Sequence, residues 1–72
     1  MINVNKLKGK VVENGYSLET FSEKIGINNS TLYRKMKGGG ENFSIGEVQR
    51  IIDVLNLSIE DVNDIFFSQI VA

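Results

Sequence analysis

Apolar residues along this chain recur mostly at intervals of three and four positions, and strict alternation of apolar and polar residues is rare. This spacing lines up apolar side chains on one face of a helix, whereas a half-buried strand needs a period of two. Glycine and N-cap residues interrupt the pattern near positions 15, 26, 38–40 and 58. The pattern therefore predicts an all-α chain of five short helices.

The first two predicted helices end at glycine, which readily takes the left-handed conformation that closes a helix. The first helix spans about residues 3–14 and ends at Gly15, and we expect four apolar residues on its inner side: Val4, Leu7, Val11 and Val12. The second follows the N-cap residue Ser17 and ends at Gly26. Its inner residues are expected to be Leu18, Phe21 and Ile25.

The other three helices are predicted from their caps. Asn28 or Asn29 can cap a third helix that runs to about Lys37, where three glycines end it. A fourth begins after Ser44, which forms a capping-box pattern with Glu47, and a fifth begins after Ser58. Their inner residues are expected to be Leu32 and Met36 in the third helix, Ile45, Val48, Ile51, Ile52 and Leu55 in the fourth, and Val62, Ile65 and Phe66 in the fifth.

Composition excludes several kinds of chemistry. The chain has 72 residues, which is the size of one small domain, and it contains no Cys and no His. Cysteine-based zinc sites and Cys/His catalysis are therefore excluded, and no catalytic constellation is present. We expect no enzymatic activity, no metal, no cofactor and no small-molecule substrate.

The charge is unevenly distributed. The formal net charge of −1 argues against a nucleic-acid partner, but it is an average over the whole chain. Residues 1–37 contain seven Lys and Arg against three Asp and Glu, a net +4, whereas residues 38–72 have a net −5. The first half can therefore present a basic surface.

Residues 18–37 fit the needs of two helices that cross at a tight turn. A small residue, Ser22, is placed where the second of these helices crosses the first, and Gly26 suits a turn with positive φ. The apolar residues that bracket the crossing are Phe21, Ile25, Ile27, Leu32 and Met36.

The segment of residues 17–38, SLETFSEKIGINNSTLYRKMKG, resembles the Cro/repressor-type helix-turn-helix proteins of temperate phages and bacteria, the XRE family. Its most specific pieces are EKIG at residues 23–26 and STLYRK at residues 30–35. The resemblance covers nearly the whole chain. It implies a compact five-helix, lambda-repressor-like DNA-binding domain over residues 1–72, with the helix-turn-helix motif at about residues 17–37.

The resemblance also implies that the third helix enters the major groove of double-stranded operator DNA. Helical geometry puts five residues on its outer side, opposite Leu32 and Met36: Ser30, Thr31, Tyr33, Arg34 and Lys37. The implied base-reading residues are Asn28, Asn29, Ser30 and Arg34, since Asn pairs with adenine, Arg with guanine and Ser with either. The implied phosphate contacts are Ser17, Thr31, Tyr33, Lys35, Lys37, Asn42 and Ser44.

Other interpretations of the same residues remain open. The basic residues of the third helix also suit a solvated face, and the asparagines also suit simple caps. Many family members have Gln at the position of Leu18, whose side chain forms no hydrogen bond. Together with the few cations outside residues 6–37, this departure predicts modest DNA affinity with a shallow salt dependence.

The last residues suggest a protein partner as an alternative. One helix cannot turn all five apolar residues near its end into a small core, namely Ile65, Phe66, Phe67, Ile70 and Val71. Either the helix closes the core and residues 70–72 fray, or some of Phe66, Phe67, Ile70 and Val71 form an exposed partner surface. Such a surface supports either a homodimer on a palindromic operator or binding to another protein. Two functions follow: a phage or prophage Cro-like regulator, and a modulator or antirepressor that binds the cognate phage repressor protein.

The compartment is inferred from segments that are missing. The first ten residues are polar and basic, and no apolar stretch is long enough to span a bilayer. We therefore expect a protein of the bacterial host cytoplasm with no membrane partner.

Overall fold

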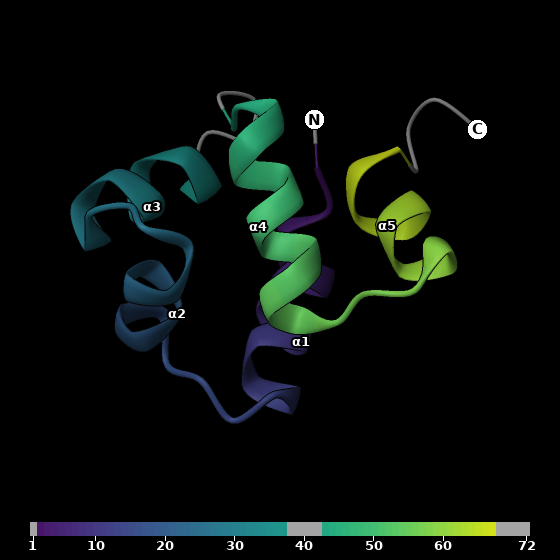
Figure 1. Ribbon diagram of the computed structural model, residues 1–72, viewed down its shortest axis with the longest axis horizontal. Helices are drawn as coiled ribbons and strands as arrows, with labels where there is room; N and C mark the ends of the chain where they lie inside the picture. Colours follow the sequence, from purple (N-terminus) through teal and green to yellow (C-terminus); the bar gives the residue numbers. More distant parts are fainter. Residues whose placement is uncertain (1, 38–42, 68–72) are drawn as a thin grey trace.

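The predicted helices are present in the structure. A computed structural model describes residues 2–37 and 43–67 and contains five helices (Figure 1): α1 (Val4–Glu13), α2 (Leu18–Ile25), α3 (Asn29–Lys37), α4 (Ile45–Leu55) and α5 (Ile59–Phe66). The described residues include no strand. The all-α class and the five-helix count expected from apolar spacing are confirmed.

Each helix begins at a side chain that accepts a hydrogen bond from the backbone of its first turn. Ser17, Ser44 and Ser58 accept from backbone N–H groups three residues later, at 3.0–3.1 Å. In α4 and α5 the bond is reciprocal, since the third residue also accepts from the cap backbone. Asn28 rather than Asn29 caps α3, because its Oδ1 accepts from the backbone of Ser30 at 2.7 Å. These caps satisfy N–H groups that have no partner within the helix.

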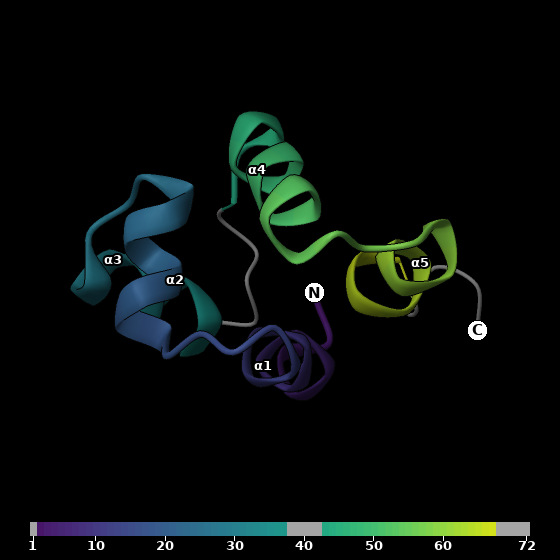
Figure 2. The same cartoon turned by 60° about the horizontal axis from the view of Figure 1, so that its bottom comes forward.

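The helix pair α2–α3 lies at one end of the molecule and α5 at the other, with α1 and α4 between them (Figure 2). Helix α2 contacts α1, α3 and α4, whereas α5 packs mainly against α1. The orientation of α3 is therefore set through α2.

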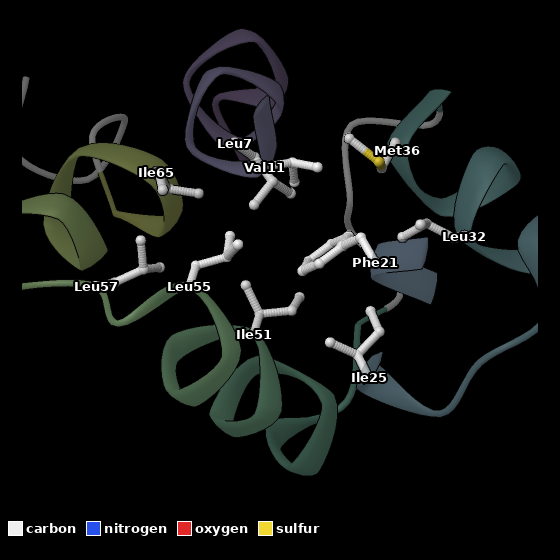
Figure 3. Packing of buried hydrophobic residues seen from close by; sticks show 10 residues of the cluster. All are labelled: Leu7, Val11, Phe21, Ile25, Leu32, Met36, Ile51, Leu55, Leu57 and Ile65. Atoms are coloured by element: carbon white, nitrogen blue, oxygen red, sulfur yellow. The ribbon is translucent and has the colours of Figure 1, made fainter. Parts of the chain in front are cut away.

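A single cluster of buried apolar side chains joins the five helices (Figure 3). Phe21 of α2 lies at its centre, fully buried among side chains from α1, α3 and α4. Nine of the ten buried apolar residues were expected on inner faces: Leu7, Val11, Phe21, Ile25, Leu32, Met36, Ile51, Leu55 and Ile65. The tenth, Leu57, lies in the α4–α5 connection, where helical periodicity gives no information.

Two residues expected on inner faces are exposed. Ile45 is 91% exposed and Val12 is 73% exposed. At about 100° per residue, Ile45 lies about 100° around α4 from the direction shared by Ile51 and Leu55. Val12 lies about 120° from the buried direction of α1 by the same geometry. Both predictions are wrong, because the buried face of each helix is narrower than its apolar stripe.

The turn between α2 and α3 has the expected geometry. Gly26 has φ 75° and ψ 26°, in the left-handed region, and Ser22 is buried where the helices cross. The Ser22 hydroxyl donates to the Glu19 carbonyl at 2.7 Å, so its polar group is satisfied. Arg50 of α4 donates from Nη1 to the Ile25 carbonyl at 3.2 Å and thereby caps the carboxyl end of α2.

Replacing Gly26 by alanine is expected to destabilise the fold by about 1 kcal/mol or more, because an L-residue is strained at this φ. The added Cβ would also approach Arg50 Nη1 to 3.1 Å. Urea unfolding followed by circular dichroism measures the change.

Gly9→Ala is the matched control for that variant. Gly9 lies inside α1 with nothing within 4 Å of an added Cβ, so alanine there should stabilise the helix by about 0.5–1 kcal/mol. Equal effects of the two substitutions would contradict the assigned turn geometry.

Candidate nucleic-acid interface

Helix α3 presents a polar face opposite its buried one. Leu32 and Met36 are 1% and 3% exposed, and they anchor the helix against the core. Ser30, Arg34 and Lys37 are exposed on the other side, and Tyr33 is 60% exposed on one flank. The structure therefore places three predicted DNA-contacting residues on one continuous solvent-facing surface.

Arg34 lies at the centre of this face, almost directly opposite the buried side of α3. Its Nη2 donates to the Thr31 hydroxyl at 3.4 Å, so the guanidinium extends toward the amino end of the helix. Half-buried Thr31, expected to contact phosphate, thus contacts Arg34. The remaining guanidinium N–H groups can form the two parallel bonds that guanine accepts.

The two asparagines at the amino end of α3 differ in which side-chain polar groups are free to bond to a base. A bidentate contact with adenine uses the amide oxygen and the NH₂ group together. The capping bond holds the Asn28 oxygen toward its own helix. Asn29 is exposed, and its side chain bonds to no other residue in the described ranges, so both of its polar groups can meet a base.

Lys35 lies on the opposite flank of α3 from Tyr33 and apart from the exposed face. Its Nζ is 2.6 Å from Glu47 Oε1 of α4 and 5.5 Å from the centre of the Phe43 ring. Both charged side chains are more than four-fifths buried, and Glu47 also accepts from the Ser44 backbone. The Lys35 ammonium, aided by that backbone N–H, holds the pKa of Glu47 below its usual range.

The cap residues Ser17 and Ser44 are exposed at the amino ends of α2 and α4. Each hydroxyl accepts a capping bond, and the Ser44 hydroxyl retains its own proton for donation to a phosphate. The Ser17 hydroxyl also shares a hydrogen bond of 2.9 Å with the Thr20 hydroxyl. The helix dipole also favours an anion at these ends. Asn42, the remaining residue expected to contact phosphate, lies outside the described residues.

Ion pairs between α1 and α5 remove two lysines from the basic surface. Lys6 pairs with Asp64 at 3.6 Å, and Lys10 pairs with both Asp61 and Glu13 at 3.3 Å. The Ser58 backbone N–H and then Lys10 lower the pKa of Asp61. The charge count along the sequence treated the cations of residues 1–37 as one basic group. In the structure, Lys6 and Lys10 face α5, whereas Arg34 and Lys37 lie on the exposed side of α3.

Lys8 is an exposed cation that sequence reasoning did not select. Among the residues the structure describes, it has no carboxylate within 4.0 Å, and the same is true of Arg34 and Lys37. The spacing of residues along the chain could not identify Lys8, because the neighbours of its side chain depend on how the helices pack.

The expected protein-partner residues divide into two groups. Phe66 is half-buried and packs against the core, whereas Phe67 is 44% exposed. Ile70 and Val71 lie outside the described residues. Phe67 is thus the one aromatic residue of this set that the structure places at the surface.

Comparison with protein families gives one match. The model of the Cro/C1-type HTH DNA-binding domain matches residues 6–68, which include all of α2, α3 and α4. A search of curated proteins and a search of solved structures each gave no match.

Residues 2–37 and 43–67 lack two further features. These residues contain no cluster of three or more His, Cys, Asp or Glu able to hold a metal ion. None of their helices is long and apolar enough to cross a membrane.

The Lys35–Glu47 pair predicts a pH-dependent stability. Because the folded-state pKa of Glu47 is lowered, its contribution is present above the ordinary value of 4.5 and is lost as the pH falls through the folded pKa. Glu47→Gln should therefore be less stable than the unmodified chain by about 1 kcal/mol near neutral pH. The difference should shrink progressively as the pH falls below that ordinary value.

Urea denaturation at a series of pH values measures this difference. Glu23→Gln, at an exposed carboxylate of α2, is the control and should follow the pH profile of the unmodified chain. A Glu47→Gln deficit that stays constant from neutral to acid pH would contradict the role of the ion pair.

Proposed function

We propose that this chain, which belongs to the Cro/C1-type helix-turn-helix DNA-binding family, recognises operator DNA by placing α3 in the major groove. The family assignment confirms the resemblance found in the sequence, and it makes the chain a DNA-binding transcription regulator. The operator role, the individual base contacts and an origin in a phage or prophage are parts of the proposal.

The exposed polar face of α3 is the observation that carries the proposal. Ser30 and Arg34 lie on the solvent side of a helix whose other side is fixed by Leu32 and Met36. Asn29 is exposed at the amino end of the same helix. Rigid anchoring matters because base recognition depends on hydrogen bonds whose geometry must be held. In this assignment Arg34 reads guanine, Asn29 reads adenine, and Ser30 contacts either base. Asn28 caps the helix and contributes its NH₂ group.

We call the exposed side of α3 that contains Ser30 and Arg34 the reading face. Phosphate contacts are assigned to residues around it. Tyr33 and Lys37 lie beside it on α3, and Ser17 and Ser44 mark helix starts that suit phosphate. Lys35 contributes indirectly, because its bond to Glu47 holds the amino end of α4 beside α3. It also neutralises a carboxylate that would otherwise repel a phosphate at Ser44.

The small number of unpaired cations supports modest affinity. Each neutralised phosphate adds about 0.9 to the slope of log K against log salt, so few contacts give a shallow dependence. Repression by such a protein is steric, through occupation of promoter DNA. Two copies on a palindromic operator would supply further contacts.

Arg34→Ala tests the reading face. If Arg34 reads guanine, the variant should lose about 1–3 kcal/mol of discrimination at one base pair and little at the others. Fluorescence anisotropy with the promoter duplex and with single-base variants of it measures the loss at each position. Lys24→Ala is the control, since Lys24 is an exposed cation on α2 and should leave base preference unchanged.

Two results would go against this assignment. A uniform loss across all duplexes would place Arg34 on phosphate rather than on a base. Binding of the unmodified chain that is undetectable or independent of sequence at moderate salt would overturn operator recognition itself.

A second candidate function is favoured by the end of α5. Phe67 directly follows α5 and is 44% exposed, and an exposed apolar side chain suits a protein partner. Helix α5 itself lies at the end of the molecule opposite α3 (Figure 2). The carboxyl-terminal half is also acidic, with a net charge of −5 over residues 38–72. In this alternative the chain is a modulator or antirepressor that binds the cognate phage repressor and alters its DNA binding.

Phe67→Ser tests this second candidate. It should weaken association with the purified repressor of the neighbouring gene at least tenfold, because the apolar contact is lost, and change stability by less than about 0.5 kcal/mol. Val12→Ser is the matched control, since it removes another exposed apolar side chain. Isothermal titration calorimetry measures the affinity of both variants for the repressor. Equal affinity of the two variants, or no binding at micromolar concentrations, would exclude this role of Phe67.

A further inference from the structure

A cleft of about 380 Å³ lies among α1, α2 and α3 and opens to solvent. Its lining comes from all three helices: Val4, Lys8, Leu18, Tyr33, Met36 and Lys37. Met36 is buried, and Val4 and Leu18 are half-buried, so they form an apolar floor and walls. Lys8, Tyr33 and Lys37 are exposed and form a polar rim. We call this feature the α1–α3 cleft.

We propose that the α1–α3 cleft receives the sugar–phosphate backbone of the DNA strand that borders the groove occupied by α3, and that Lys8 of α1 binds a phosphate there. This inference rests on the proposed function. It extends the DNA interface to α1, a helix outside the helix-turn-helix motif.

Continuity with the reading face is the first argument. Tyr33 and Lys37 belong to α3 and line the cleft, and Lys37 lies less than one helical turn after Arg34. Leu18 is the first residue of α2, directly after the cap residue Ser17, so the amino end of α2 borders the same cleft. A strand leaving the reading face on this side would meet two ammonium groups, a phenol hydroxyl and a helix start together.

The division of charge on α1 is the second argument. Lys6 and Lys10 point to α5, where they pair with Asp64 and Asp61. At about 100° per residue, Lys8 lies about 160–200° around the helix from both. In the described part of the chain no carboxylate lies within 4.0 Å of Lys8 or Lys37. The two rim lysines are therefore available to pair with an external anion.

The shape of the cleft favours DNA over a small ligand. Sites for small molecules bury most of the ligand surface, whereas this cleft is open to solvent. A polymer backbone can cross an open cleft, with phosphate at the lysines and deoxyribose carbons against Val4 and Leu18. A small anion with an apolar part would also match the apolar floor and the lysine rim, and the experiment below distinguishes it from DNA.

Lys8→Gln tests the inference by its effect on the salt dependence of DNA binding. Losing one phosphate contact should reduce the slope of log K against log salt by about 0.9, equally for every duplex sequence. The affinity ratio of the unmodified chain to the variant should then fall about threefold between 50 and 200 mM salt. Lys24→Gln, an exposed lysine outside the cleft, should change neither quantity. Circular dichroism melting shows that each variant is folded.

The outcomes separate the inference from the proposed function. If the unmodified chain binds the operator and Lys8→Gln leaves the slope unchanged, the inference is overturned and the proposed function stands. If the unmodified chain shows no salt-dependent binding to DNA, both are overturned. NMR titration with 4-phenylbutyrate forms the second arm, using the methyl signals of Val4 and Leu18. Saturable shifts there, together with an unchanged slope, would make the cleft a small-ligand site and overturn the inference.

Discussion

The burial of one eight-residue helix governs the arrangement of the molecule. Helix α2 contacts α1, α3 and α4, and its Phe21 and Ile25 are fully buried. Burial of side chains of this size contributes about 1.5–3 kcal/mol each, a large part of the stability of so small a domain. Helix α3 buries only Leu32 and Met36, so its direction is set by α2 and by the left-handed turn at Gly26. The position of the exposed face of α3, proposed to read DNA bases, therefore depends on the packing of α2 behind it.

Much of the fold could be predicted because it depends on local chemistry. Ser17, Ser44 and Ser58 cap helices as expected, since a capping bond needs only the residues of the first turn. Gly26 and Ser22 could be assigned because a tight helix crossing has few solutions. The outer face of α3 followed from the same periodicity that identified Leu32 and Met36 as core residues.

The features that could not be predicted join residues distant in the chain. Periodicity shows which side of a helix is buried, but not which charge lies across from it. Lys35 was grouped with the other cations of α3, yet it meets Glu47 twelve residues later. Arg50, twenty-five residues from its partner, caps the carboxyl end of α2. Lys6 and Lys8 are two positions apart, yet Lys6 pairs with Asp64 of α5 and Lys8 lines a cleft with residues of α2 and α3. Their surroundings follow only from how the helices pack.

The separation of the proposed base-reading residues from the core has a consequence for how the sequence of this protein can change. Asn29, Ser30 and Arg34 are exposed and take no part in the buried cluster. Substitutions at such surface positions usually alter stability by less than about 0.5 kcal/mol. The scaffold can therefore accept new side chains at the exposed positions of α3 without refolding, so the chemistry of this surface can change through a few substitutions while the fold stays the same.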